Sequence, residues 1–255
     1  MPNGGEIDVL DPANYGAITA THTLSIVGRG WATLSPVAGQ AAITINAGPS
    51  DKIAISGLTL DGANLTNTIG IQFNSGGSLT VRDSVIQNCT RYGILYQPNS
   101  STLTKISMSN IQVSDNNFGI YIGPVGSGIT HGVLDHVHVD NNAADGITII
   151  GTQDIKVTVT DSVIANNGGS GVVETAEDDG INLFTFVRNS TIVNNDLFGL
   201  ESVNPVSAMF FTRNLIAANG GSPDSQNSGF LASYNDNNID ENSGTASPIT
   251  ILPYK

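Results

Sequence analysis

Cysteine is almost absent from this 255-residue chain, and charged residues are few. The single cysteine, Cys89, has no partner for an internal disulfide, so the sequence gives no sign of an oxidising compartment. Charged residues make up 12% of the chain, and nine Lys and Arg stand against 22 Asp and Glu, for a formal net charge of −13. Because an acidic chain repels phosphate backbones, we do not expect nucleic acid as a partner.

Long apolar runs are also missing. No stretch reaches the ~18 consecutive apolar residues of a membrane-spanning helix, so membrane insertion is not expected. Residues 1–5 contain no basic segment followed by an apolar run, so no signal peptide is recognisable. If the protein is exported, its signal has been removed or lies outside this sequence.

The helical 3.6-residue period is absent, and a repeat of about 26 residues takes its place. A glycine opens a short apolar strand in each unit, and successive glycines are 23, 26, 27, 25 and 28 residues apart. They are Gly70, Gly93, Gly119, Gly146, Gly171 and Gly199. Between them, apolar residues alternate in β-branched runs such as residues 157–160, which is typical of strands.

Three further positions repeat with the glycines. The first is an Asx residue four or five positions before most of the glycines. The second is an apolar residue two positions before that Asx residue. The third, which is mostly Asx, lies three positions before the apolar residue. The first series is Asn88, Asp115, Asn141, Asn166 and Asn194, continued by Asn219; the second is Ile86, Val113, Val139, Ile164, Ile192 and Ala217; the third is Asp83, Asn110, His136, Asp161, Asn189 and Asn214. Asn tolerates left-handed turn conformations and its amide can bond to the next amide, so we expect Asn ladders.

Units this short cannot bury their own apolar side chains, but stacking at a strand spacing of ~4.8 Å places like positions above one another and creates a core. The pattern resembles the right-handed parallel β-helix repeat family, the scaffold of pectate lyases, polygalacturonases and phage tailspikes, over residues 53–234. The resemblance implies an all-β fold, a single right-handed parallel β-helix of roughly nine coils that forms one domain over residues 1–255.

The ends of the chain are less regular. Residues 6–10, 24–27 and 42–45 are predicted strands of the first coils, and the last strand is expected at about 249–252. An irregular loop is expected at about 220–228, projecting from the side of the solenoid. No amphipathic helix precedes Ile7 to cap the first coil. We therefore expect a missing N-terminal cap or a partner over that end, such as a second copy in a homo-oligomer.

One acidic cluster is a candidate for chemistry. Pectate lyases combine calcium-binding carboxylates with an arginine that abstracts a proton, and the resemblance offers Glu174, Asp178 and Asp179 with Arg188 for these roles. The sequence requires no cofactor, but calcium is the cation that such a cluster could hold. The polygalacturonase pattern does not fit, because His131 precedes the aspartates and no Arg-Ile-Lys segment exists.

Alternative interpretations exist for the same residues. Glu174 aligns with Ile122 and Ile149, which are predicted to face inward. The favoured interpretation is that the chain leaves the solenoid there as an acidic turn. The alternative is that the Glu174 carboxylate enters the core at a cost of several kcal/mol. We predict that Arg188 and Arg213 occupy the same position on neighbouring coils, with Arg82 at that position further away. Arg188 and Arg213 could form a small basic spot, but we favour the interpretation that they are ordinary exposed arginines.

Three histidines lie close together in sequence. His136 and His138 are two residues apart on a predicted strand and face the same side, a spacing that zinc or copper could use with Asp135 or Asp140. However, His136 also fits the repeating Asx position, which explains it without a metal. We therefore predict no metal site.

Aromatic residues lie beside the glycine corners. Tyr92 and Phe118 directly precede glycines, as does Phe198, and Tyr121 occupies an outward position shared with Leu95 and Glu201. Aromatic faces with a polar tip suit sugar rings; corner packing explains Tyr121 equally well and is the favoured interpretation for Phe118 and Phe198. We predict Tyr92, Tyr121 and Glu201 as ligand-binding residues.

The sequence thus leaves open whether the protein is an enzyme. The favoured hypothesis is a secreted or cell-surface β-helix that binds polysaccharide or serves as a scaffold without catalysis. The alternative is a diverged polysaccharide lyase or glycoside hydrolase acting on an acidic glycan around Glu174 to Asp179.

Overall fold

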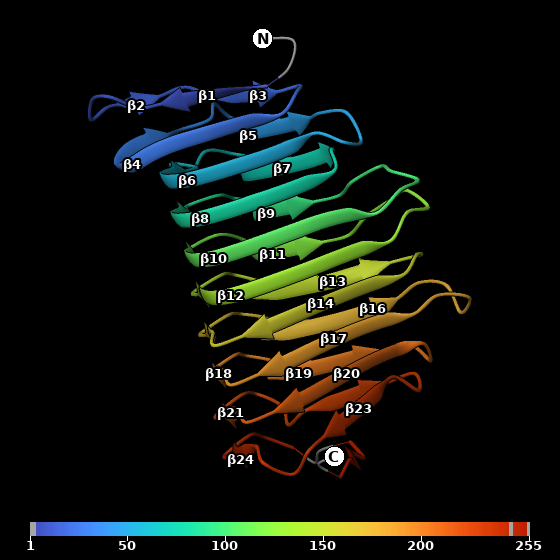
Figure 1. Cartoon of the computed structure of the whole chain (residues 1–255). Helices are drawn as coiled ribbons and strands as arrows, with labels where there is room; N and C mark the ends of the chain where they lie inside the picture. Colours follow the sequence, from blue (N-terminus) through green and yellow to red (C-terminus); the bar gives the residue numbers. More distant parts are fainter. Residues whose placement is uncertain (1–3, 245–246, 254–255) are drawn as a thin grey trace.

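Parallel strands stacked along one axis form the whole of the molecule (Figure 1). The computed structural model describes residues 4–244 and 247–253, and within these ranges there are strands and turns but no helix. Every strand pairing in this part of the chain is parallel, and each strand pairs with its equivalent one coil away. The predicted all-β solenoid of roughly nine coils is confirmed.

The strands form two sheets, which we call the long sheet and the short sheet. The long sheet contains 16 strands within the described residues: β1 (Gly5–Asp8), β2 (Asn14–Tyr15), β4 (Leu24–Leu34), β6 (Lys52–Asp61), β8 (Ser78–Gln87), β10 (Thr104–Ser114), β12 (Thr130–Asp140), β14 (Ile155–Thr160), β15 (Val163–Ala165), β17 (Leu183–Arg188), β18 (Thr191–Val193), β20 (Ser207–Thr212), β21 (Leu215–Ala217), β23 (Phe230–Ser233), β24 (Asn238–Asp240) and β25 (Thr250–Ile251).

The short sheet supplies one strand to each coil. Over the same ranges it has nine strands: β3 (Ile18–Ala20), β5 (Ala41–Asn46), β7 (Ile69–Ser75), β9 (Tyr92–Tyr96), β11 (Phe118–Ile122), β13 (Ile147–Gly151), β16 (Val172–Ala176), β19 (Leu200–Val203) and β22 (Asp224–Gln226). Inward residues of both sheets form one continuous apolar core.

Like residues lie in columns along this core. Ile86, Val113 and Val139 pair directly, and the column continues through Ile164, Ile192 and Ile216. All six are fully buried. In that coil Ile216 holds the position and pairs onward with Ile239, so the prediction of Ala217 was wrong by one residue, because this repeat is shorter than the one before it.

Each long strand bends sharply at the second Asx position. Asp83, Asn110, His136, Asp161 and Asn189 all have φ between 47° and 52°, the left-handed conformation. Arg213, with φ of 57°, occupies this position in the next coil instead of the predicted Asn214. Asn214 lies one residue on, where its Nδ2 donates to Asn237 Oδ1 at 2.9 Å.

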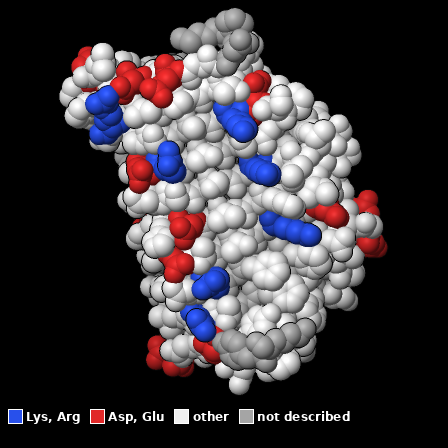
Figure 2. Space-filling model, in the orientation of Figure 1, with Lys and Arg blue, Asp and Glu red and all other residues white. Residues whose placement is uncertain are grey.

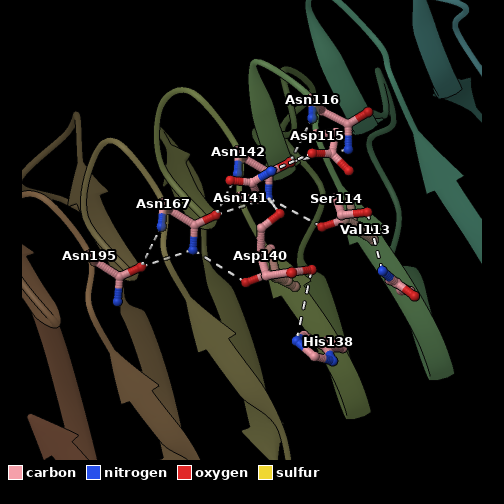
Figure 3. Close-up of polar contacts among 12 residues, drawn as sticks. Val113, Ser114, Asp115, Asn116, His138, Asp140, Asn141, Asn142, Asn167 and Asn195 are labelled. Atoms are coloured by element: carbon pink, nitrogen blue, oxygen red, sulfur yellow. Dashed lines mark hydrogen bonds and ion pairs between the residues drawn. The ribbon is translucent and has the colours of Figure 1, made fainter.

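In the turn before the short sheet, one residue adopts a positive φ and the next one makes the hydrogen bonds of the ladder. Asn88, Asp115, Asn141, Asn166 and Asn194 adopt the left-handed conformation and are mostly exposed. The ladder is built by the next residue in each coil: Asn116, Asn142, Asn167, Asn195, Asn219 and Asn242. Figure 3 shows the first four of them. Asn219 therefore belongs to the ladder, and Ala218 has the positive φ in its coil.

The repeating glycines allow close approach rather than positive φ. A Cβ on Gly119 would lie 2.4 Å from the carbonyl oxygen of Gly146, and one on Gly146 would lie 2.8 Å from that of Gly171. Neither glycine has a positive φ. Side chains at this column would collide with the backbone of the next coil.

The two ends differ from the predictions in detail. The segment 220–228, predicted as a projecting loop, contains β22 and continues the short sheet, because β22 pairs with β19 and Gly221 with Phe198. The terminal strand β25 lies within the predicted range of 249–252. At the first coil, Ile7 is 39% and Leu10 is 79% exposed. Homo-oligomerisation over that end stays a prediction.

Candidate functional site

The outward face of the short sheet brings the predicted ligand-binding residues into one surface. Tyr121 in β11 pairs with Leu95 in β9 and with Thr148 in β13. The same column continues through Val173 in β16 to Glu201 in β19. Tyr121 and Glu201 therefore lie three coils apart, or about 14 Å at the usual strand spacing.

Three aromatic rings from two coils, Tyr92, Phe118 and Tyr121, form what we call the outer aromatic cluster. Tyr92 and Phe118 stack with ring centroids 5.4 Å apart. Tyr121 meets Tyr92 edge to face at 5.3 Å and Phe118 at 6.4 Å. Tyr92 and Tyr121 also pack on a small apolar cluster separate from the core, with Leu95 among its buried members. All three rings are only half-buried, so part of each stays accessible.

Arg91 adds a cation to this cluster. Its guanidinium carbon lies over the ring of Tyr92, 5.4 Å from the centroid, and its side chain is exposed. The sequence analysis missed Arg91, although it directly precedes a singled-out tyrosine. Stacking of Arg on an aromatic face holds the guanidinium in place with donors free for a ligand.

Outward residues between the cluster and Glu201 are nearly covered. Leu95 is 4% exposed, and Thr148 and Val173 are each 8% exposed, although the register directs all three away from the core. A strand face in open solvent would leave such residues more accessible. Side chains beside the column therefore shield it from water.

The other end of the column is acidic. Glu201 accepts hydrogen bonds from Ser170 Oγ and Gln226 Nε2, both at 2.8 Å. Partial burial raises the pKa of Glu201, the Ser170 hydroxyl opposes this, and the nearby carboxylates of Asp145 and Asp224 raise it further. The pKa of Tyr121 is raised by burial, then by Tyr92 and Glu177, so its phenol remains a hydrogen-bond donor at neutral pH.

Glu174 lies inside the core, so the expectation that an acidic turn begins there was wrong. Strand β16 continues past it to Ala176, and Glu174 pairs with Ile149 and Ser202 as an inward residue with no exposed surface. Ser202 Oγ donates to Glu174 Oε1 at 2.8 Å, while Oε2 has no partner among the described residues. Burial raises the pKa of Glu174 to about 8, and the hydroxyls of Thr185 and Ser202 lower it less.

The other predicted catalytic residues do not join Glu174. Asp178 and Asp179 are exposed in the turn after β16, where Asp178 Oδ1 accepts the amide of Gly180 at 2.8 Å. Arg188 is exposed at the far end of β17, on the long sheet. The four candidates thus occupy the core, an outer turn and another face. Asp178 and Asp179 share that turn, while Glu174 and Arg188 lie apart from them.

The predicted arginine register also needs correction. Arg188 pairs with Thr212, so Arg213 lies one position beyond it, at the bend. Arg213 Nε is 3.6 Å from Asp236 Oδ2 and faces that carboxylate. Arg82 and Arg188 do share a column, four coils apart.

His136 and His138 lie beside different carboxylates. His136 Nδ1 is 2.8 Å from Asp135 Oδ1, and His138 Nε2 is 3.8 Å from Asp140 Oδ1 (Figure 3). Within the described residues there is no group of three or more His, Cys, Asp or Glu side chains that could hold a metal ion. No helix long and apolar enough to cross a membrane occurs in that part of the chain.

Comparison with solved structures finds similar chains. The A-module of the mannuronan C-5 epimerase AlgE6 from Azotobacter vinelandii is similar, with a TM-score of 0.64 and 15% identity over 91% of this chain and 72% of the module. ORF18 of Geobacillus virus E2 matches with a TM-score of 0.49, 14% identity, and coverage of 94% of this chain and 52% of that one. No curated protein matches in sequence.

The sequence also matches a family model described as a right-handed β-helix region over residues 44–196. This range contains most of the glycine column, most of the bends and most of the Asn ladder. With the parallel strands and stacked columns of the structure, it shows that the chain belongs to the right-handed parallel β-helix family.

Proposed function

We propose that the protein binds a polysaccharide along the outer face of the short sheet, without catalysis, as a secreted or cell-surface protein. The observation that carries the proposal is the outer aromatic cluster, whose three rings from β9 and β11 present a partly accessible aromatic surface. Sugar rings stack on such surfaces through their C–H faces, while hydroxyl groups bond to polar side chains nearby.

Polar groups for those hydroxyls lie along the same column. Arg91 supplies donors at one end, and Glu201, Ser170 and Gln226 supply acceptors and donors at the other. A chain of several sugars is long enough to touch both ends. The AlgE6 module, which shares the fold, is named for a polysaccharide, mannuronan. That name supports the ligand class but assigns no residue here.

The separated acidic residues favour binding over turnover. A lyase or glycosidase needs its acid and base on either side of one bond. Glu174 is enclosed by the core and Asp178 is exposed on a turn, so they do not flank one ligand.

The test is binding of a neutral and an acidic polymer, hydroxyethyl cellulose and polygalacturonate, by affinity electrophoresis and calorimetry. At about 0.5 M NaCl, charge attraction is screened and stacking persists. We expect Tyr121→Ala and Tyr92→Ala to weaken binding about tenfold each, equivalent to about 1.4 kcal/mol. The matched control is Trp31→Ala, an exposed aromatic in the first coils, 46% accessible.

Two results would contradict the proposal. One is equal binding by the wild type and the tyrosine variants. The other is release of unsaturated uronate products, seen as ultraviolet absorbance, because it would show lyase activity. Fractionation of the source cells for the protein tests the proposed location.

A further inference from the structure

The few cations of this acidic protein gather on the outer face of the long sheet. Six of the nine Lys and Arg residues lie in its strands: Arg29, Lys52, Arg82, Lys105, Lys156 and Arg188. Figure 2 shows Lys and Arg in two rows on this face, with uncharged surface between them. The same strands also carry seven Asp and Glu residues, so positive charge predominates only along one of the two rows.

One row is formed by strand register, and we call it the lysine row. Lys105 pairs with His131 in the next coil, and His131 pairs with Lys156 in the coil after that. Lys52 belongs to the same column two coils earlier, through Ser78. All three lysines and His131 are exposed. Lys105, His131 and Lys156 follow one another at one strand spacing, about 4.8 Å, and Lys52 lies two such spacings from Lys105.

The lysine row has no counter-charge within ion-pair distance. No Lys52, Lys105 or Lys156 nitrogen lies within 4.0 Å of a carboxylate in the described part of the chain. The acidic residues nearest to Lys52 and Lys156 in sequence accept hydrogen bonds from other groups. Asp51 accepts hydrogen bonds from Thr23 and Gly48, and Asp154 accepts from the amide of Asn182 at 2.8 Å.

The other row has mixed charge. Arg82 and Arg188 share a column with Asp135, which pairs with His136. Asp161, at the adjacent bend, accepts a hydrogen bond from Asn189. Hydrogen bonds from Thr160 and Asn189 lower the pKa of Asp161, and the charge of Arg188 lowers it further. This edge is close to neutral, so the attraction for an anion is centred on the lysine row.

Uncharged and aromatic residues lie between and beyond the cations. The central column runs through Thr80, Ser107, Val133 and Thr158 to Phe186 and Phe210. The lysine row itself continues into Phe184 after Lys156. Phe186 and Phe210 stack with centroids 5.0 Å apart and planes 14° apart, and Phe186 is 42% exposed. Such stacked rings in solvent form a platform for a flat, partly apolar group.

We propose that this face is a second binding surface, which takes a linear acidic polysaccharide laid along the solenoid axis. Carboxylates of successive sugars bond to Lys105, His131 and Lys156, and sugar rings further along lie on Phe184 and Phe186. The proposal stands on the long sheet alone and does not rest on the function proposed for the short sheet.

Charge density favours this ligand over nucleic acid. The lysine row offers at most one cation in each coil of about 4.8 Å. Duplex DNA carries one negative charge in every ~1.7 Å, so most of its charge would remain uncompensated against an acidic protein. A uronate polymer carries one charge on each sugar. Its charge spacing along an extended chain is therefore of the same order as that of the row.

The experiment measures polygalacturonate binding at about 0.02 M NaCl, where charge attraction is little screened. Lys105→Gln/Lys156→Gln is expected to weaken binding at least tenfold and to flatten its dependence on salt. The matched control, Arg29→Gln/Arg213→Gln, removes two cations already paired with Asp8 and Asp236 and is expected to change binding less than threefold. Phe186→Ala is expected to weaken binding about threefold at every salt concentration.

Equal weakening by both double variants would overturn the proposal, because only net charge would matter. The proposal would also be overturned if single-stranded DNA bound more tightly than polygalacturonate and Lys105→Gln/Lys156→Gln abolished that DNA binding. Tyr121→Ala separates the two surfaces. If Tyr121→Ala abolishes polygalacturonate binding at low salt and the lysine variant does not weaken it, the surface on the long sheet is refuted and that on the short sheet is not. If Tyr121→Ala leaves the lysine-dependent binding intact, the surface on the long sheet stands independently.

Discussion

Asn142 Nδ2 donates to Asn167 Oδ1 at 2.9 Å, one full coil further along the chain. The same Oδ1 accepts the backbone amide of Asn142 at 3.1 Å, so one side chain satisfies two buried donors of its neighbour. Asn167 in turn donates to Asn195 and to the carbonyl oxygen of Val139. The ladder thus connects coils where the chain turns and no strand pairing is available.

Replacing Asn167 by Ala should therefore destabilise the protein. The amide of Asn142 and its side chain would lose their acceptor in a buried site, at a cost of about 1–3 kcal/mol for each unsatisfied group. Chemical denaturation followed by circular dichroism measures this. The matched control is Asn166→Gly, at the adjacent exposed position with φ of 55°, where glycine adopts the same conformation and little change is expected. Equal losses in the two variants would contradict the division of roles.

Stability should fall as pH rises because of Glu174. Burial raises the pKa of Glu174 to about 8 from an ordinary value of 4.5, so between these values the unfolded chain releases a proton that the folded chain keeps. The free energy of unfolding is then highest below about pH 4.5 for this group and declines up to about pH 8, by about 1.4 kcal/mol for each unit of pKa difference.

Glu174→Gln should remove this decline and stabilise the protein at pH 8, because the amide is neutral at all pH values. Denaturation midpoints of both proteins from pH 5 to 9 provide the measurement. Glu177→Gln, an exposed neighbour, serves as the control and should follow the wild type. Parallel pH profiles for wild type and Glu174→Gln would refute a neutral Glu174 in the core.

Gly146→Ala should destabilise the solenoid by forcing two coils apart. A Cβ there would lie 2.8 Å from the carbonyl oxygen of Gly171 and 2.9 Å from Asn167 Nδ2. Overpacking against backbone costs about 1–3 kcal/mol. Gly180→Ala, in the exposed turn, meets only the flexible Asp178 side chain at 3.3 Å and should be nearly neutral. Thermal unfolding of both variants compares the costs, and equal shifts would contradict the close approach.

Cys89 should react with thiol reagents only when the protein unfolds. The side chain is 1% exposed, and burial raises the pKa of its thiol to about 12. Because the thiolate is the reactive form, labelling by a disulfide reagent at pH 8 should be at least about a hundredfold slower than for a free thiol. Ser127→Cys at an exposed turn provides a reactive control. Rapid labelling of native Cys89 would show that this turn opens.

Several features of the fold were predictable because a solenoid repeats in sequence as it does in space. The spacing of the glycines and of Ile86, Val113 and Ile164 predicted the stacked core, which the pairing confirms. The inward register of Glu174 was also correct, but the favoured conclusion that the chain leaves the coil there was wrong. A buried acid costs least when it is neutral and hydrogen-bonded; the raised pKa keeps Glu174 neutral, and Ser202 Oγ donates a hydrogen bond to it.

Errors arose where repeats change length or where adjacent residues share a type. A shortened coil between Arg188 and Thr212 moved Ala217, Arg213 and Asn214 by one position each from their predicted columns. Two asparagines side by side, as in Asn141 and Asn142, could not be told apart by spacing, although one has a positive φ and the other is buried in the ladder.

The sequence by itself determined the period, the strand faces and therefore the family of the fold, because each follows from residue types at fixed intervals. Only the tertiary structure decided which surfaces the coils create. Arg91 with Tyr92 and Tyr121, the lysine row, and the separation of Glu174 from Asp178 all depend on the register between neighbouring coils and on side-chain direction. The physical reason is that hydrophobic burial fixes the inward positions strongly, while outward residues become neighbours only after stacking has brought distant segments together.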